Sequence, residues 1–180
     1  MCYATISYCF NYANIGFSYA TKEPAGGKGS PRMGGICGYL TTAQPLTMDN
    51  CANFGSVYNG FVNSTRTNVG NLIGYGQAST GIIKNCLCAG DCLTEGPARA
   101  DGVRAGIIVG CQAKSATYGT ETEPIYILKG IKVTYAYTAG AVTTVIDEDN
   151  YESKLEGQPT DGNVFHAALV STVEEGMAKL

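Results

Sequence analysis

The feature that most constrains this 180-residue chain is a glycine-bounded block that recurs at a fixed interval. The block begins at Gly34, Gly70 and Gly106, which are 36 residues apart, and a further glycine follows four residues after each. Its three copies read GGICGY, GNLIGY and GIIVGC. A fixed period of roughly 20 to 50 residues usually marks one supersecondary unit that buries its apolar face by stacking on copies of itself. The sequence therefore predicts a stacked repeat architecture.

A second block, centred on cysteine, repeats in another phase. Its copies occupy residues 6–15, 48–57 and 83–92. The aligned cysteines are Cys9, Cys51 and Cys86, and their spacings are 42 and 35 residues, so the segments between blocks vary in length. The variable segments span 17–32, 58–68 and 93–104. They are rich in Gly, Pro, Thr, Asn and charge, which predicts exposed connections.

Each block is short, apolar or β-branched, and bounded by Gly or Asn, so each is interpreted as a strand. Helical repeats are disfavoured because 24 glycines would cost such helices about 1 kcal/mol at each interior position. We expect an all-β solenoid whose coils contain about three short strands each, with equivalent positions stacked in parallel at about 4.8 Å.

Stacking places equivalent side chains in columns. Three internal columns are predicted: Cys9 with Cys51 and Cys86, Ile36 with Leu72 and Ile108, and Ile15 with Val57 and Cys92. Two asparagine pairs are predicted at bends: Asn50 with Asn85, and Asn11 with Asn53. Asparagine tolerates the left-handed region and hydrogen-bonds to backbone or to its own stacked copy.

These blocks resemble the GLUG-type repeats of bacterial surface proteins. The resemblance rests on MDNCANFGSV with NVGNLIGYG and on IKNCLCAGDC with RAGIIVGCQ, and it covers about residues 6–111. It implies a right-handed parallel β-helix in a large extracellular or cell-surface protein, where the repeats act as scaffold, spacer or adhesion module. It implies no catalytic residue and no cofactor. The partners it implies are further repeats of the parent protein and a host or bacterial glycan or protein.

The domain organisation follows from the repeat. The solenoid is predicted over residues 1–140, with copies at about 6–40, 48–76 and 82–112 and a divergent copy at 125–140, where Ile131-Lys132 are aligned with Ile83-Lys84. Residues 141–180 are predicted to be a C-terminal capping or linker region. Thr172 and Glu175 have the spacing of a capping box, which predicts a short C-terminal helix from about Val173 that covers the open end of the solenoid.

Composition excludes some partners. The 12 Lys and Arg are scattered and outnumbered by 15 Asp and Glu, whereas nucleic-acid binding calls for a basic patch. No apolar run approaches the roughly 18 residues of a membrane span. The N-terminus also lacks the pattern of a signal peptide, because its first cation is Lys22.

Eight cysteines allow three interpretations. They could fill core columns as small apolar side chains, since Cys37 aligns with Ile73 and Val109. Stacked thiols could instead form a Cys9–Cys51 or Cys51–Cys86 disulfide, because about 4.8 Å lies within the Cα range of a disulfide. The cluster of Cys86, Cys88 and Cys92 could bind a metal, but the single histidine, His166, is far away in sequence. The interchange with Ile and Val favours core packing, and no metal ligand is assigned.

Other motifs are interpreted as structural. The acidic stretch at Asp147, Glu148, Asp149 and Glu152 lacks the glycine of a calcium loop and is expected to be a solvated loop. His166 has no Ser or Cys partner in a known motif. The sequon at 63–65 and the glycine-rich segment 26–30 fit exposed connections.

The competing hypothesis is a polysaccharide lyase or glycosidase built on a β-helix. Such an enzyme needs clustered carboxylates with a nearby Arg or Lys. The acids within the repeats, chiefly Asp49, Asp91, Glu95 and Asp101, do not share a repeat position. The sequence therefore favours a non-enzymatic module and assigns no catalytic or cofactor-binding residue.

Overall fold

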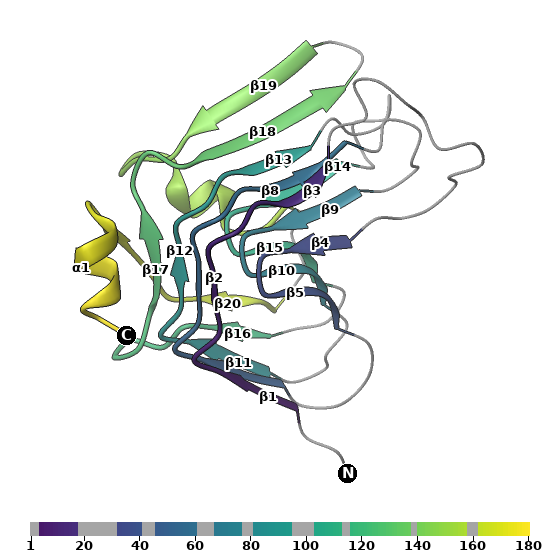
Figure 1. Ribbon diagram of the computed structural model, residues 1–180. Helices are drawn as coiled ribbons and strands as arrows, with labels where there is room; N and C mark the ends of the chain where they lie inside the picture. Colours follow the sequence, from purple (N-terminus) through teal and green to yellow (C-terminus); the bar gives the residue numbers. More distant parts are fainter. Residues whose placement is uncertain are drawn as a thin grey trace.

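The chain forms a parallel β-solenoid in which each coil passes through up to five sheets (Figure 1). The computed structural model describes residues 4–17, 32–40, 46–60, 67–76, 81–94, 103–112, 116–137, 140–157 and 162–180. The all-β solenoid fold with a short C-terminal helix is confirmed. The expected three strands per coil is wrong, because each of the first three coils contributes one strand to every one of five sheets.

The five sheets are named A to E in the order in which the chain reaches them. Sheet A contains β1 Ala4–Ser7, β6 Leu46–Asp49, β11 Gly81–Lys84, β16 Thr117–Tyr118 and β20 Val164–Phe165. Sheet B contains β2 Phe10–Asn11, β7 Ala52–Asn53, β12 Leu87–Cys88, β17 Ile125–Leu128 and β21 Ala167–Val170. Sheet C contains β3 Ile15–Phe17, β8 Val57–Asn59, β13 Cys92–Thr94, β18 Lys132–Tyr137 and β19 Gly140–Val145. Sheet D contains β4 Arg32–Gly34, β9 Thr67–Gly70 and β14 Val103–Gly106, and sheet E contains β5 Cys37–Leu40, β10 Ile73–Gly76 and β15 Val109–Gln112.

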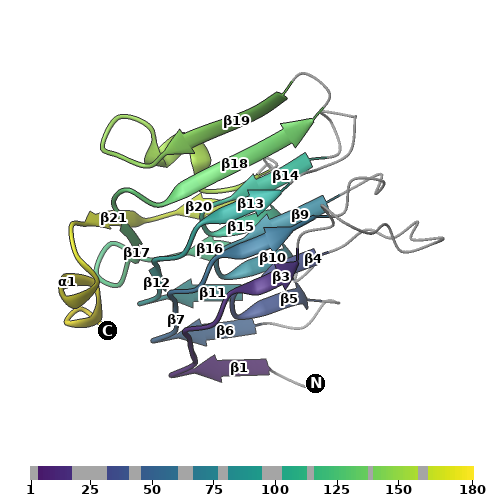
Figure 2. The same ribbon diagram turned by 45° about the horizontal axis from the view of Figure 1, so that its top comes forward.

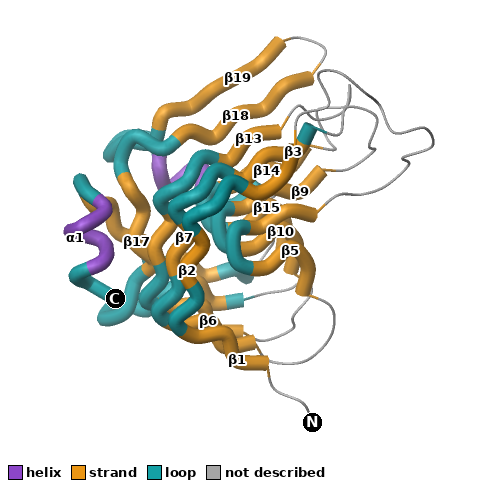
Figure 3. The backbone as a smooth tube through the Cα atoms, viewed as in Figure 1, coloured by secondary structure: helices purple, strands orange, loops and turns teal. Residues whose placement is uncertain are grey.

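Sheets A, B and C form three sides of the solenoid, and sheets D and E fold back between A and C as an inner arch (Figures 1 and 2). Sheet D lies beside sheet C, and sheet E lies between D and A (Figure 1). Among the described residues, all strand pairs are parallel except β18 with β19. Teal turns separate the short strands of successive coils at matching positions (Figure 3).

The recurring glycines make the arch possible. A Cβ added to Gly74 would lie 2.5 Å from the Met33 nitrogen and 2.6 Å from the Gly38 oxygen, and one added to Gly110 would lie 2.6 Å from the Gly74 oxygen and from the Val69 nitrogen. Sheets D and E therefore pack backbone to backbone, and a side chain at these positions would separate them. The glycine block is not one strand, as its composition suggested, but the end of a D strand, a bend and the start of an E strand.

The three predicted columns are confirmed. Ile36, Leu72 and Ile108 are joined by hydrogen bonds from the Ile36 N–H to the Leu72 oxygen and from the Leu72 N–H to the Ile108 oxygen. Ile15 pairs with Val57, and Val57 pairs with Cys92. Leu72, Ile108, Val57 and Cys92 are fully buried, so the columns form the core of the solenoid.

The hydrogen bonds of the three thiols show that the cysteines form a column. The thiols of Cys9, Cys51 and Cys86 each donate to the carbonyl oxygen two residues earlier, at 3.7, 3.3 and 3.0 Å. The three side chains therefore have the same direction in successive coils. Cys51 and Cys86 are buried, but Cys9 is exposed because it belongs to the first coil, beneath which the described residues place no further coil.

Asn50 and Asn85 are confirmed at bends, whereas Asn11 and Asn53 form the expected stacked pair but lie in strands β2 and β7 rather than at a bend. Asn50 and Asn85 have φ of 53° and 47°, and Tyr8 takes the same left-handed conformation in the first coil at 54°. The Asn11 amide donates to Asn53 Oδ1 at 2.6 Å, as expected of a stacked pair.

The fourth coil departs from the sequence alignment. Ile131 and Lys132 do not take the places of Ile83 and Lys84, because Val133 pairs with Cys92 and Ile83 pairs with Tyr118. The alignment failed because residues 119–124 add an excursion between β16 and β17 that the repeat lacks.

After β18 the chain turns back as antiparallel β19, forms the 3-10 helix η2 Tyr151–Lys154, and adds one layer to the arch. In that layer the Leu155 oxygen accepts from the Ile108 N–H at 2.9 Å, and the Gly157 N–H donates to the Val109 oxygen at 2.9 Å. Strands β20 and β21 then add a fifth layer to sheets A and B. The predicted capping region therefore supplies three strands and an arch layer.

The C-terminal helix α1 Val173–Met177 begins as expected, with the Thr172 side chain accepting from the Glu175 N–H at 3.1 Å. It does not cover the open end of the solenoid. It lies on the outer face of sheet B instead (Figure 1), where a second apolar cluster contains Ala52, Leu87 and Val170. The helix packs on those outward-facing apolar residues through Met177, which ends it, and Leu180, which follows it.

Candidate functional site

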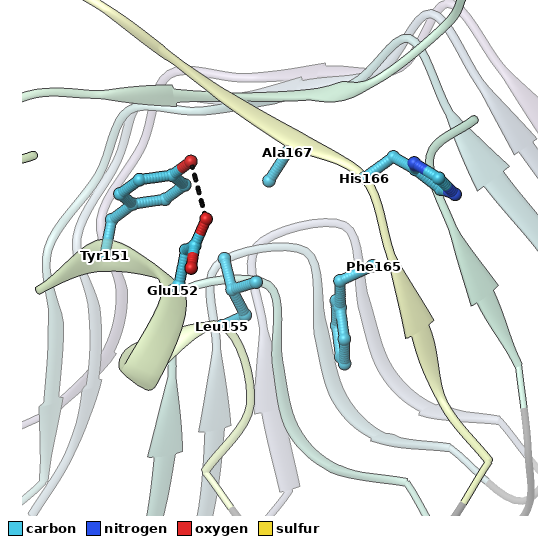
Figure 4. A pocket seen from close by; sticks show the side chains of 6 residues that line it. All are labelled: Tyr151, Glu152, Leu155, Phe165, His166 and Ala167. Atoms are coloured by element: carbon cyan, nitrogen blue, oxygen red, sulfur yellow. Dashed lines mark hydrogen bonds between the residues drawn. The ribbon is translucent and has the colours of Figure 1, made fainter. Parts of the chain in front are cut away.

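A cleft lies at the C-terminal end of the solenoid, above the last layer of the arch. It has a volume of about 390 Å³ and is lined by Tyr151, Glu152, Leu155, Phe165, His166 and Ala167 (Figure 4). In the fifth layer the described residues supply β20, β21 and β19 to sheets A, B and C but no arch strand, so the space above Leu155 stays open. The cleft is therefore a consequence of how the stack ends.

The cleft combines an apolar base with a polar pair. Leu155 is buried, and the Phe165 ring stacks on Tyr118 with centroids 4.8 Å apart. The Tyr151 hydroxyl donates to Glu152 Oε1 at 3.2 Å (Figure 4). Partial burial, with the nearby Glu152 carboxylate, raises the pKa of Tyr151, so the phenol stays protonated at neutral pH. The pair is suited to hydrogen bonding with a polar ligand.

His166 lines the cleft, but its imidazole points away from Tyr151 and Glu152 (Figure 4). Its backbone belongs to the solenoid: its N–H donates to the Tyr118 oxygen at 2.7 Å, and its carbonyl accepts from the Ile125 N–H at 2.9 Å. The structure does not bring the imidazole and the carboxylate together as an acid and base pair.

The acidic stretch is organised as a turn. Asp147 Oδ1 accepts from the Asp149 N–H at 3.0 Å, and Asn150 Oδ1 accepts from the Asp147 N–H at 3.2 Å. Glu148 pairs with Lys129 at 2.6 Å, and this contact lowers the pKa of Glu148. Across the described segments, no group of three His, Cys, Asp or Glu side chains is placed to hold a metal ion.

The seven cysteines among the described residues are free thiols. Burial raises the pKa of Cys88 and Cys92, and the side-chain hydrogen bond with Cys51, together with burial, raises the pKa of Cys86. A thiol of raised pKa is neutral and a poor nucleophile. Cys86, Cys88 and Cys92 therefore act in the structure as small packing side chains.

A charged cluster at the corner of sheets A and B was missed by sequence reasoning. Lys84 Nζ lies 2.7 Å from both Glu123 oxygens, and the Asn85 amide donates to Asp49 Oδ1 at 3.3 Å and to Glu123 Oε1 at 3.0 Å. Lys84 lowers the pKa of Glu123. The signal available in the sequence was that Asp49 and Lys84 share a repeat position; Glu123 comes from the unrepeated excursion. The cluster ties that excursion to two coils.

A second cluster lies between the arch sheets. The Arg32 guanidinium carbon is 3.8 Å from the Tyr39 ring centroid and 4.5 Å from that of Tyr75. Arg32 pairs in register with Asn68, and Asn68 with Arg104, whose guanidinium approaches the Cys111 sulfur at 3.4 Å. Aromatic and sulfur contacts hold these arginines against the arch.

Comparison with known proteins adds no identity: no family model, no curated protein and no solved structure matches this chain. Among the described residues, no helix is long and apolar enough to cross a membrane.

Proposed function

We propose that this chain is a non-enzymatic scaffold, spacer or adhesion module of a bacterial surface or secreted protein of the GLUG-repeat type. One observation carries the proposal: the repeated residues make hydrogen bonds and close contacts with neighbouring coils. The cysteine column, the Leu72 column and the arch glycines all serve contacts between layers. A chain whose repeated residues maintain a stack is suited to hold other surfaces at a fixed distance.

The height of the stack follows from its layers. Sheets A and B each have five strands, which at about 4.8 Å per layer gives a body about 20 Å tall. Ligand contact in this proposal belongs to the outer faces and to the cleft at Tyr151 and Glu152, because these groups are not used in stacking. Fold alone does not distinguish a spacer from an enzyme, so the site must be tested directly.

Binding and turnover should be measured on the same sample. We expect the chain to bind a subset of glycans or matrix proteins on an array, with no product released from uronic-acid or neutral polysaccharides. Release of reducing ends or unsaturated uronates above background would support the β-helix enzyme instead. In that event Glu152→Gln tests whether the cleft is responsible, with Glu148→Gln as a matched control on an exposed carboxylate paired to Lys129.

A further inference from the structure

The two ends of the stack differ in how their strand edges are protected. The first coil, residues 4–17 and 32–40 as described, contains one charged side chain, Arg32, which is held over Tyr39. The other end has antiparallel β19 as the edge strand of sheet C and the acidic turn at 147–149. Natural sheets protect free edges with charge, bulges or covering segments. Among the described residues, the first coil is therefore the less protected edge.

The backbone of Phe10 is directed at this edge. The carbonyls of its neighbours, Cys9 and Asn11, accept from the N–H groups of Ala52 and Phe54 at 3.0 and 2.9 Å, so both point into the stack. Because successive residues of a strand direct their backbone groups to opposite sides, the N–H and carbonyl of Phe10 face outward. They form a donor and acceptor pair ready for another strand.

Three aromatic side chains surround this point. Tyr8, Phe10 and Tyr12 are 69%, 39% and 72% exposed. Phe10 pairs in register with Ala52 on the outer face of sheet B, and the Tyr12 ring stacks on Phe54 with centroids 4.7 Å apart. Tyr8 and Tyr12 lie two residues before and two residues after Phe10, so the order of the three aromatic residues is the same in either chain direction.

We propose that two copies of this chain join first coil to first coil about a two-fold axis through Phe10. The half-turn sets β2 antiparallel to the partner's β2, so that the two Phe10 residues exchange both backbone hydrogen bonds and Tyr8 lies opposite the partner's Tyr12. Sheets A and C lie on either side of sheet B (Figure 1), so the same rotation sets β1 beside the partner's β3. These strands have four and three residues. An isologous contact of this kind needs a self-complementary surface, which the aromatic row provides.

The size of the surface fits a stable interface. The described part of the first coil has 23 residues, and standard interfaces use roughly 20 to 30 residues a side. Head-to-tail stacking fits less well, because a first coil placed on β20 and β21 would leave the cleft above Leu155 unfilled. The two-fold dimer directs both clefts outward, so an adhesive module would become bivalent.

Sedimentation velocity of the full chain across a concentration series tests the proposal. We expect a monomer–dimer equilibrium that Phe10→Lys shifts to monomer, because the axis sets the two new charges directly opposite each other. Ile82→Lys is the matched control: Ile82 is 47% exposed on β11, within the stack, and the variant should remain dimeric. In the wild type, amide exchange at Phe10 should slow as concentration rises.

Circular dichroism and the thermal midpoint show whether Phe10→Lys retains the fold. If it does not, Tyr12→Lys replaces it, since that side chain is the most exposed of the three. A monomer at every concentration would overturn the proposal. A dimer that survives both aromatic variants would overturn it as well, because its interface would lie elsewhere.

Discussion

Leu72 is the centre of the aliphatic column, with Ile36 on one side and Ile108 on the other, and it is fully buried. Replacing it with Ala removes packing from three layers whose backbones are fixed by hydrogen bonds, so the gap has little freedom to collapse. We expect Leu72→Ala to lower the free energy of unfolding by about 2 to 5 kcal/mol, measured by urea denaturation. Ile82→Ala, at an exposed outer position, should cost about 0.5 kcal/mol or less. Equal costs at the two positions would contradict the column.

Cysteine reactivity should follow position in the stack. Cys9 is exposed, whereas Cys51, Cys86, Cys88, Cys92 and Cys111 are buried. Iodoacetamide should therefore modify Cys9 in the folded protein and reach the buried five only in denaturant, as peptide mass spectrometry can resolve. Modification of Cys86 at the rate of Cys9 without denaturant would show that the column opens in solution.

The columns were predictable because equivalent residues carry the same chemistry at the same repeat position, as in Ile36, Leu72 and Ile108. The link between Asn53 and Asn71 was not. The Asn53 amide donates to Asn71 Oδ1 at 3.1 Å, and the Asn71 amide donates to the Gly90 oxygen. Asn53 lies on β7 of sheet B and Asn71 lies in the bend between β9 and β10, and only the fold of the arch brings them together. A repeat aligns a residue with its copies but does not show which other sheet it faces.

The arch depends on glycine more than any other element does. A Cβ at Gly74 would meet three backbone atoms, Met33 N, Gly38 O and Arg32 C, at 2.5 to 2.8 Å. Backbone cannot move away as a side chain can, so Gly74→Ala should destabilise by about 1 to 3 kcal/mol or more. Gly130→Ala is the control: φ is +89° there, but nothing lies within 4 Å of the added Cβ. We expect a larger loss of thermal midpoint for Gly74→Ala, and the reverse order would contradict close packing of sheets D and E.

Elements were harder to predict than columns. Strands β2, β7 and β12 are two residues long, too short for any hydrophobic period to show. The glycine block suggested one strand, although glycines at its first and fifth positions were the available sign of two backbones in contact. The position of α1 could not be inferred from its capping box, because Thr172 and Glu175 define where a helix begins and not what it packs against. The apolar outer face of sheet B determines where the helix packs.

The molecule as a whole should open from one end. In a stack each coil is stabilised by its neighbours, so coils in the middle gain from two interfaces and an end coil from one. The first coil has neighbours on one side only among the described residues, while the second and third are enclosed on both sides.

The rate of amide exchange should therefore be higher in the first coil than in the two coils that follow it. We expect the bonded amides of the first coil, such as Ile15 and Ile36, to exchange faster than Leu72 and Leu87 of the next two, although all four donate to backbone oxygens at 2.9 to 3.1 Å. The monomeric Phe10→Lys variant is the correct sample, because dimerisation would protect the same edge. Adding Leu72→Ala should accelerate amide exchange at Leu87 and its neighbours, because the lost packing lies in the enclosed layers. The ratio between the exchange rates of the first coil and of the middle coils should therefore change. Uniform rates for all four amides would show instead that the coils unfold as one unit, with no weaker end.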